Sequence, residues 1–213
     1  HVTRGEEWIS SVPIHLEMFK VLEFETPIYC HFPVIMKLDN DKRRKLSKRK
    51  DEEASVDYFL SQGYPIEGFL EYLMTLANSN FEEWRLEHPF NDIFEFELSF
   101  SKMSLDGALF DIDKIKSISK DRLAFMDANT FVKNALEYGK NYDDILHLTI
   151  LSDEEYFKEI ISIERNPEKP RKDYEKYSDI LEVIGFMYEP FNDRLFEAGI
   201  EFKSQFPNDL IIE

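Results

Sequence analysis

The residues with the clearest chemistry form a run of cations between Lys42 and Lys50. Seven of these nine residues are Lys or Arg, and only Leu46 and Ser47 interrupt them. The run stands out because the whole chain has a formal net charge of -17. Cations packed this closely repel one another unless an anion lies between them. The run therefore predicts a site for a polyphosphate or a nucleic acid, on a protein whose remaining surface repels both.

The segment Lys45-Leu46-Ser47-Lys48-Arg49 is the part of this run that could do chemistry. Two lysines three residues apart on one loop can reach the oxygens of a single polyphosphate, and Ser47 can donate its hydroxyl. Lysine suits phosphoryl chemistry because its flexible point charge can follow the charge that moves during the reaction. The alternatives to a catalytic role are a solvated basic loop and a nuclear-import tag.

The elements that precede this run are typical of the start of an α/β domain, with the order strand, helix, strand. Residues 1–3 are β-prone, and Ser10 or Ser11 could cap a helix that has Pro13 in its first turn. Because the apolar residues of that helix do not fall in one stripe, we expect most of it to be buried. Residues 28–38 form a second extended run, interrupted at Pro33. Turn residues then place the basic run on a loop after a strand.

The rest of the chain has the pattern of helices. Ser55 is a candidate cap for a short helix that ends at Gly63, and Pro65 begins another helix with an apolar stripe. The stripe consists of Ile66, Phe69, Leu70, Leu73 and Leu76. Later helices are expected after a capping box, Ser152-Asp153-Glu154-Glu155, and over residues 177–188. We therefore predict an α/β portion followed by a mostly α-helical region, predominantly α overall, with the join within residues 102–125.

Composition limits the class of protein and its compartment. With 43% hydrophobic and 15% aromatic residues, the chain of 213 residues can bury a sizeable core, which argues against disorder. Cys30 is the only cysteine, so no disulfide forms within the chain and no cysteine-rich metal site exists. No apolar stretch approaches the roughly 20 residues that a membrane span needs. We therefore expect a cytoplasmic protein with no membrane partner and no bound metal.

Several motifs occur together in an order that resembles one family. Lys45-Leu46-Ser47-Lys48-Arg49 resembles the Lys-Met-Ser-Lys-Ser signature of class I aminoacyl-tRNA synthetases. Other segments resemble glutamyl-tRNA synthetases, namely His1-Val2-Thr3-Arg4-Gly5-Glu6-Glu7-Trp8, Ser11-Val12-Pro13-Ile14-His15, His31-Phe32-Pro33, Gly63-Tyr64-Pro65, Leu70-Glu71-Tyr72-Leu73 and Phe110-Asp111-Ile112-Asp113-Lys114. The similarity is dense over roughly residues 1–80 and thin beyond about residue 125.

This resemblance implies a fold and an activity. Residues 1–54 would be the C-terminal part of a Rossmann-like catalytic domain, residues 55–120 a connecting helical region that contacts the tRNA stem, and residues 121–213 part of a helical anticodon-binding domain. The intact enzyme would activate glutamate with ATP and transfer it to the 3′ end of its tRNA. Its partners would be tRNA, ATP and glutamate, and Mg²⁺ would accompany ATP.

The resemblance also implies roles for residues near the N-terminus. Arg4 would pair with a carboxylate of the glutamate substrate, because guanidinium geometry suits bidentate contacts. Glu7 and Trp8 would lie near the adenylate and the tRNA acceptor end, with Glu7 in the ATP site. The alternatives are that Arg4 forms a surface ion pair of little consequence and that Trp8 belongs to the core.

The remaining implied roles concern ATP. The main chain of Val34 and Ile35 would recognise adenine, while Lys45 and Lys48 would neutralise the phosphates during catalysis and Ser47 would add a donor. For Val34 and Ile35 the alternative is that they are ordinary apolar strand residues.

Two departures from the family are visible in the sequence. Many members have His-Gly after the Lys-Arg of the signature, whereas this chain has Lys50 and Asp51, followed by Glu52 and Glu53. One hypothesis is that this acidic patch holds the basic loop open until ATP arrives. The second departure is that the chain, which begins at His1, contains no His-x-Gly-His segment, the other ATP signature of the family. We therefore expect a fragment that cannot form glutamyl-adenylate alone.

Three other interpretations remain open from the sequence. A glutaminyl-tRNA synthetase is a close rival, although its anticodon region is a pair of β-barrels and residues after 125 are predicted to be helical. A second rival is the short glutamyl transferase that modifies a tRNA base and lacks an anticodon domain. The long helical C-terminal half of this chain argues against that assignment. The third rival is a non-enzymatic RNA-binding module that uses the basic loop, and it predicts salt-dependent RNA binding by the isolated chain.

Overall fold

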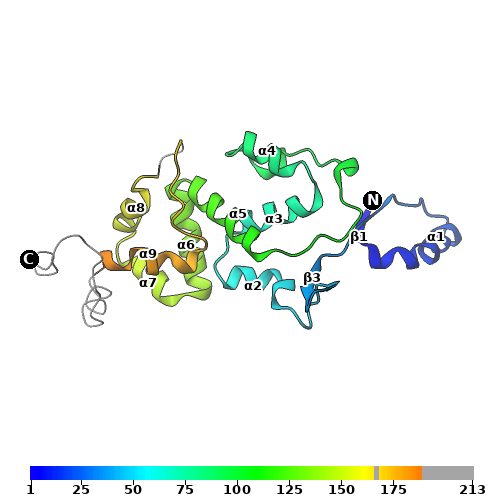
Figure 1. Ribbon diagram of the computed structural model, residues 1–213, viewed down its shortest axis with the longest axis horizontal. Helices are drawn as coiled ribbons and strands as arrows, with labels where there is room; N and C mark the ends of the chain where they lie inside the picture. Colours follow the sequence, from blue (N-terminus) through cyan, green and yellow to red (C-terminus); the bar gives the residue numbers. More distant parts are fainter. Residues whose placement is uncertain (166–167, 189–213) are drawn as a thin grey trace, which may run out of the picture.

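The computed structural model describes residues 1–165 and 168–188. Figure 1 shows an elongated molecule whose elements follow one another along the long axis in roughly chain order. The helix α1 and strand β1 lie at one end, α2, α3 and α5 lie in the middle, and α6 to α9 lie toward the other end. The fold is predominantly helical with two small sheets, so the predicted order of an α/β portion and then a helical region is confirmed.

The N-terminal portion is a parallel strand pair joined by a helix. Its elements are β1 (Val2–Gly5), the 3₁₀ helix η1 (Glu6–Ser11), α1 (Val12–Val21) and β2 (Tyr29–Phe32). Strand β1 pairs with β2 from Val2 opposite Tyr29 to Gly5 opposite Phe32. A parallel pair needs a long crossover, which η1 and α1 supply. The predicted order of strand, helix and strand is therefore confirmed.

The expectation that most of α1 is buried is wrong. None of its residues is buried, and Ile14 and Val21 are 65% and 73% exposed. The helix packs mainly against η1, and in the described part of the chain no second helical layer covers it. Ser11 does precede the helix, but its hydroxyl donates to the Trp8 carbonyl and makes no capping hydrogen bond.

The extended run over residues 28–38 is two strands rather than one. Strand β2 ends before Pro33, and the next strand β3 (Met36–Asp39) belongs to a different sheet, an antiparallel hairpin with β4 (Lys42–Lys45). Asn40 and Asp41 form the turn with positive φ of 48° and 64°, as tight hairpin turns require. The prediction that the basic run lies on a loop is therefore wrong for its first four residues, which form β4.

The middle of the molecule packs α3 against α5. Its elements are η2 (Glu52–Ala54), α2 (Val56–Ser61), α3 (Ile66–Ala77), α4 (Phe81–Glu87), η3 (Ile93–Glu95), η4 (Phe100–Lys102) and α5 (Ile112–Phe125). Phe59, Tyr64, Phe69, Tyr72 and Ile115 form the core there. The predicted stripe on α3 is only partly right, because Ile66 and Leu70 are 41% and 38% exposed. Gly68 faces Ser119 of α5 instead, so this close approach sets which face of α3 is inward.

The second half of the chain is a helical unit with its own core. Its elements are α6 (Ala128–Tyr142), α7 (Asp144–Ser152), α8 (Glu154–Ser162), η5 (Tyr177–Asp179), α9 (Ile180–Ile184) and η6 (Gly185–Met187). The core includes Phe131, Ala135, Leu146, Ile150, Phe157 and Ile180, all fully buried. The predicted join within residues 102–125 is wrong, because the last strand in the described residues, β4, ends at Lys45 and only helices follow it. Helix α5 instead contributes to both cores, with Ile115 in the first and Leu123 in the second.

Two predictions about this half need correction. The cap of α8 is Asp153, whose carboxylate accepts from the Tyr156 N–H at 2.9 Å, rather than Ser152, which is the last residue of α7. The single helix predicted over residues 177–188 is divided into η5, α9 and η6. Within residues 1–165 and 168–188, no helix is long and apolar enough to cross a membrane.

Candidate functional site

A cavity of about 930 Å³ lies where the first half of the molecule brings its strands and helices together. One wall comes from Gly5 at the end of β1 and Glu7 in η1, together with Val34 and Ile35 between β2 and β3. The basic run supplies the rim, and α2, α3 and the segment around Phe110 supply the opposite wall. The size is that of a pocket for a small molecule or cofactor.

Six of the eight residues singled out in the sequence line this one cavity: Glu7, Val34, Ile35, Lys45, Ser47 and Lys48. They come from three separate segments of the chain, and the fold gathers them around one space. Arg4 and Trp8 are not among its lining residues. Arg4 nevertheless directly precedes Gly5, which is one of them.

Lys45 is already paired across the cavity. Its Nζ lies 2.6 Å from Oε1 of Glu7, so the hairpin strand β4 is joined to the segment that follows β1. The hydrogen bond from Lys45 holds the pKa of Glu7 below its ordinary value. Both side chains remain about half exposed, so the pair is open to competition from another anion.

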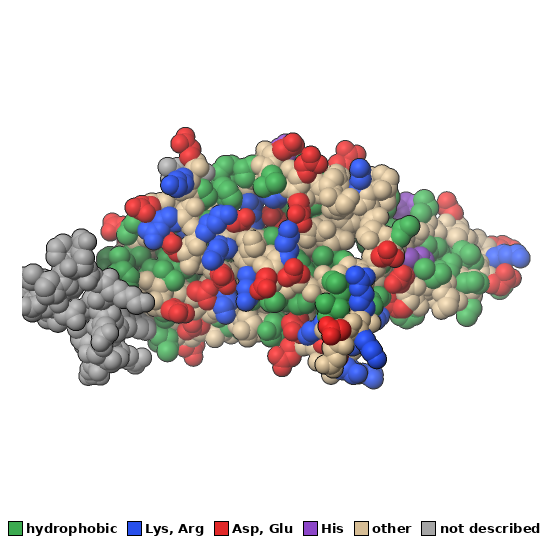
Figure 2. Space-filling view, in the orientation of Figure 1, with side chains coloured by type: hydrophobic (Ala, Val, Ile, Leu, Met, Phe, Trp, Pro, Cys, Tyr) green, Lys and Arg blue, Asp and Glu red, His purple; other side chains and the backbone are tan. Residues whose placement is uncertain are grey.

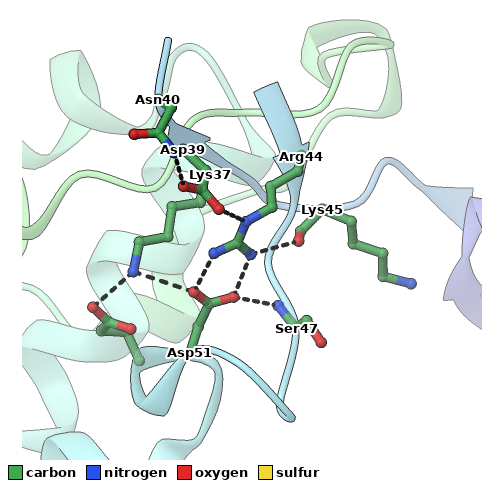
Figure 3. A network of polar contacts seen from close by, with 8 residues as sticks. Lys37, Asp39, Asn40, Arg44, Lys45, Ser47 and Asp51 are labelled. Carbon is green, nitrogen blue, oxygen red and sulfur yellow. Dashed lines mark hydrogen bonds and ion pairs between the residues drawn. The ribbon is translucent and has the colours of Figure 1, made fainter. Parts of the chain in front are cut away.

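Asp51 makes the densest set of polar contacts near the cavity (Figure 3). Its two oxygens accept from Arg44 at 2.6 and 2.7 Å, and Oδ2 also accepts from the backbone N–H of Ser47 at 2.9 Å. Lys37 lies 3.3 Å from Oδ1 and also binds Glu53 at 3.0 Å. The Arg44 guanidinium, with help from the Ser47 N–H, holds the pKa of Asp51 well below its usual range.

The basic run is therefore divided by its partners. Arg44 faces Asp51 and also binds Asp39 at 2.7 Å, whereas Lys45 and Lys48 line the cavity. Among the described residues, Lys48 and Arg49 form no ion pair, and both are exposed. Figure 2 shows Lys and Arg side chains together near the β3 hairpin, next to red carboxylates. Cations without partners at the rim of a cavity are the arrangement that an anionic ligand would neutralise.

Arg4 lies half-buried among neutral acceptors and rings. Its Nε donates to Nε2 of His31 at 3.2 Å, and both Nη atoms lie 3.3 Å from Nδ1 of His15. Because a guanidinium has no acceptor, the imidazole nitrogens must accept here. The guanidinium carbon also lies 5.1 Å from the Tyr29 ring and 5.8 Å from the Trp8 ring. Trp8 itself is 53% exposed, so it is not a core residue.

The main chain beside the cavity is partly engaged. The Val34 N–H donates to Oε1 of Glu6 at 3.3 Å, and the Ile35 carbonyl accepts from the Leu46 N–H at 2.8 Å. Gly107 lies against this segment so closely that an added Cβ would be 2.5 Å from the Val34 carbonyl oxygen. The contact from Leu46 fixes the basic run relative to the segment expected to recognise adenine.

Sequence reasoning missed the opposite wall of the cavity. It is lined by Ala54, Ser55, Val56, Phe69, Tyr72, Leu73 and Phe110. Tyr72 and Phe110 lie within segments that match the family, but no role was attached to them. Their contacts explain the matches, because the Tyr72 hydroxyl accepts from the Asp111 N–H at 2.8 Å and the Phe110 N–H donates to the Met36 carbonyl at 2.7 Å. These bonds tie α3 and strand β3 to one segment.

Away from the cavity, the buried carboxylate of Glu71 pairs with Arg85 at 2.7 Å and with Arg122 at 3.3 Å. In residues 1–165 and 168–188, no group of three His, Cys, Asp or Glu side chains could hold a metal ion. Two basic residues between α8 and η5 form ion pairs outside the cavity. Arg171 pairs with Glu164 and Asp173, and Lys172 pairs with Asp121.

Comparisons with known proteins all point to the same family. Residues 1–116 match the family of class I tRNA synthetases (E and Q), catalytic domain. Over 213 residues the chain is 41% identical to a glutamate–tRNA ligase of Clostridium perfringens, covering 100% of this chain and 38% of that protein. It is 43% identical to a glutamate–tRNA ligase of Acetivibrio thermocellus over 191 residues, or 90% of this chain and 35% of that protein. The chain thus spans well under half of the length of these relatives.

Solved structures with the same fold are also known. A glutamate tRNA ligase from Elizabethkingia meningosepticum, in complex with its amino acid, matches with a TM-score of 0.58 at 21% identity, over 87% of this chain and 37% of that one. The glutamate–tRNA synthetase from Elizabethkingia anophelis matches with a TM-score of 0.56 at 22% identity, over 87% and 38%. At this identity the likeness concerns the fold alone.

Proposed function

The chain belongs to the class I tRNA synthetases of the glutamate and glutamine group, and on that premise we propose that it is a piece of a glutamate–tRNA ligase. The intact protein activates glutamate with ATP and transfers it to the 3′ end of its tRNA. The observation that carries the proposal is the cavity lined by Glu7, Lys45 and Lys48. Its cations suit the phosphates of ATP, because Lys48 forms no ion pair in the described residues and Lys45 is held only by a half-exposed pair with Glu7.

Glutamate rather than glutamine is the proposed amino acid. The family match covers both specificities, but the relatives at 41% and 43% identity are named glutamate–tRNA ligases. Arg4 is assigned to a carboxylate of this substrate, because a guanidinium forms bidentate contacts with a carboxylate. In the described residues Arg4 has no carboxylate partner, so its charge is available to the substrate.

The proposed division of labour follows from where each group lies. Lys45 exchanges its contact with Glu7 for a phosphate oxygen, and Lys48 approaches the same phosphates from the exposed side of the loop. Their charges offset the negative charge that develops as pyrophosphate leaves. Ser47 adds a hydroxyl donor. ATP enters with its Mg²⁺, and Trp8, which is exposed, lies toward the tRNA acceptor end.

Adenine recognition is assigned to the main chain of Val34 and Ile35, which lines the same cavity. We propose residues 1–54 as the C-terminal part of a Rossmann-like catalytic domain, 55–120 as a connecting region that contacts the tRNA stem, and 121–213 as part of an anticodon-binding domain. Residues 189–213 of the last range lie outside the described part. The cytoplasmic location expected from the single cysteine stays a prediction.

The test is glutamate-dependent exchange of pyrophosphate into ATP, with tRNA present, by the whole encoded polypeptide that contains this chain. We expect exchange, and we expect Lys48→Ala to lower kcat/KM for ATP by roughly 100-fold, since one charge that stabilises the transition state is lost. Lys42→Ala is the matched control, because Lys42 is exposed on β4 and does not line the cavity. It should leave the exchange unchanged.

The isolated chain provides the second arm. Because it contains no His-x-Gly-His segment, we propose that it does not form glutamyl-adenylate alone. Exchange above background by the isolated chain would refute that part. If the whole polypeptide bound RNA in a salt-dependent manner but exchanged no pyrophosphate, the RNA-binding alternative would replace the proposed function.

A further inference from the structure

Asp51 is an unusual residue for its place in the sequence. It lies in a strongly charged segment between the basic run and two glutamates, yet it is only 4% exposed. Burying a carboxylate is unfavourable unless it is paired and hydrogen-bonded. Asp51 meets this condition with contacts from three segments: Lys37 in β3, Arg44 in β4 and the Ser47 N–H in the loop. Figure 3 shows these groups converging on its two oxygens.

The contacts of Asp51 close the loop on itself. The Ser47 carbonyl accepts from the N–H groups of Lys50 and Asp51, each at 2.9 Å, while the Ser47 N–H donates back to the Asp51 carboxylate. The segment from Ser47 to Asp51 is thus a turn with hydrogen bonds at both ends. Lys48 and Arg49 lie at its middle and have no other support among the described residues.

The alternation of side chains along β4 explains why Asp51 does not pair with the lysines that line the cavity. Successive side chains of β4 point to opposite faces, so Arg44 is directed to Asp51 and Lys45 is directed away from it (Figure 3). The two cations that pair with Asp51, Arg44 and Lys37, are therefore not among those that line the cavity.

The acidic residues that follow are not equivalent to Asp51. Glu52 is exposed and forms no ion pair among the described residues, and Glu53 binds Lys37. None of the three carboxylates contacts Lys45 or Lys48, whose only ion-pair partner in the described residues is Glu7. That the acidic patch holds the basic loop open until ATP arrives stays a hypothesis. Among the three carboxylates, these contacts single out Asp51 as the residue that shapes the loop.

We propose that Asp51 is a positioning residue for ATP, which holds the turn from Ser47 to Asp51 so that Lys45 and Lys48 are presented to the phosphates. This inference rests on the proposed function of the cavity. Asp51 acts through Arg44 and the loop backbone and does not touch ATP. Because Arg44 and Ser47 keep the pKa of Asp51 well below its usual range, the carboxylate stays charged across the working pH of an enzyme.

The decisive variant is Asp51→Asn in the whole encoded polypeptide. Asparagine keeps the size and one oxygen for the Ser47 N–H but loses the charge and half of the bidentate contact with Arg44. We expect KM for ATP in pyrophosphate exchange to rise about 10-fold or more, with KM for glutamate changed less than about 2-fold. Glu52→Gln removes a neighbouring charge without removing a contact, and it should leave both constants as they are.

Arg44→Lys is a second variant that keeps Asp51 and the charge but loses the paired hydrogen bonds. It should raise KM for ATP selectively as well, and it decides the matter if thermal unfolding shows that Asp51→Asn does not fold. The proposal is overturned if the folded variants leave KM for ATP unchanged, or raise the KM of both substrates equally. A wild-type polypeptide without glutamate-dependent exchange would instead refute the proposed function, so the two failures are distinct.

Discussion

The contacts of Arg4 in the described part of the chain fix its guanidinium without supplying a carboxylate to pair with it. A surface ion pair was one interpretation of this residue, yet its partners are two imidazole nitrogens, the Trp8 carbonyl and two aromatic rings. These groups fix the orientation of the guanidinium and leave its charge uncompensated. A cation held in this way loses little conformational entropy when a carboxylate arrives. The arrangement therefore favours a binding role over a stabilising one.

The first prediction at this scale concerns Arg4→Lys in the whole polypeptide. Lysine keeps the charge but cannot form two parallel hydrogen bonds to one carboxylate. We expect KM for glutamate to rise roughly 10- to 100-fold, while KM for ATP stays within about 2-fold. Arg43→Lys is the control, because Arg43 is exposed on β4 and does not line the cavity. Equal values of KM for glutamate in both variants would remove Arg4 from the substrate site.

At the scale of elements, local chemistry predicted some features well. The motif order placed Glu7, Val34 and Lys45 near one another, and they do line one cavity, because the parallel pair β1 and β2 and the β3 hairpin bring those segments together. The pairing of β3 with β4 was not predicted. It depends on positive φ at Asn40 and Asp41, and turn residues alone do not specify which hairpin register they close.

Features that depend on distant packing escaped prediction. Apolar composition around α1 predicted burial, but burial requires a second layer, and the described residues do not supply one. On α3 the inward face is set by Gly68 against Ser119 of α5, a contact that no pattern within α3 specifies. Tyr72, four residues after Gly68 on the same helix, lines the cavity. A single sequence does not reveal which helix will lie opposite.

The prediction at this scale concerns the start of α6, where Asp127 is the cap. Its carboxylate accepts from the Thr130 N–H at 3.1 Å and from the Thr130 hydroxyl at 2.6 Å. Asp127→Ala should lower the free energy of unfolding by about 1 kcal/mol near pH 7. The hydrogen bond from the Thr130 hydroxyl lowers the pKa of Asp127 from its ordinary 3.8, and the bond from the Thr130 N–H adds to this effect. Its stabilisation is therefore complete above that ordinary value, and it is lost as pH falls below it and through the lowered pKa of the folded state.

Urea denaturation from pH 7 to about pH 3 tests this prediction. The difference in free energy of unfolding between wild type and variant should shrink as the carboxylate becomes protonated. Asn129→Ala is the matched control one residue into the helix. It removes an exposed side chain that makes no hydrogen bond in the described residues, and it should change stability little. A gap that stays constant down to pH 3, or an equal loss in the control, would contradict the capping role.

At the scale of the whole molecule, the two halves meet at the turn between α2 and α3. Gly63 has a φ of 90°, and its carbonyl accepts from the Tyr177 N–H at 2.7 Å. Two neighbouring carbonyls also accept bonds from the second half, from the Ser178 hydroxyl at 3.0 Å and from the Tyr138 hydroxyl at 3.4 Å. This turn therefore joins the half that holds the cavity to the helical unit of α6 to α9.

The last prediction is that Gly63→Ala weakens this junction. An added Cβ would lie 2.7 Å from the Ser178 backbone nitrogen and 3.2 Å from the Tyr138 ring, at a φ that alanine disfavours. We expect a loss of about 1 to 3 kcal/mol in the free energy of unfolding. The two tryptophans, Trp8 and Trp84, both lie in the first half, so their fluorescence follows that half, whereas far-ultraviolet circular dichroism follows all helices.

In wild type the junction should make the two signals change together during denaturation, and in Gly63→Ala they should separate because the halves no longer unfold as one unit. Gln62→Ala is the control. It removes a side chain but keeps the carbonyl that accepts from Ser178, so its transitions should still coincide. If the signals of Gly63→Ala also coincide and its stability equals that of Gln62→Ala, the turn does not couple the halves. Their cooperation would then depend on other contacts between the halves and on the short link of Met126 and Asp127 between α5 and α6.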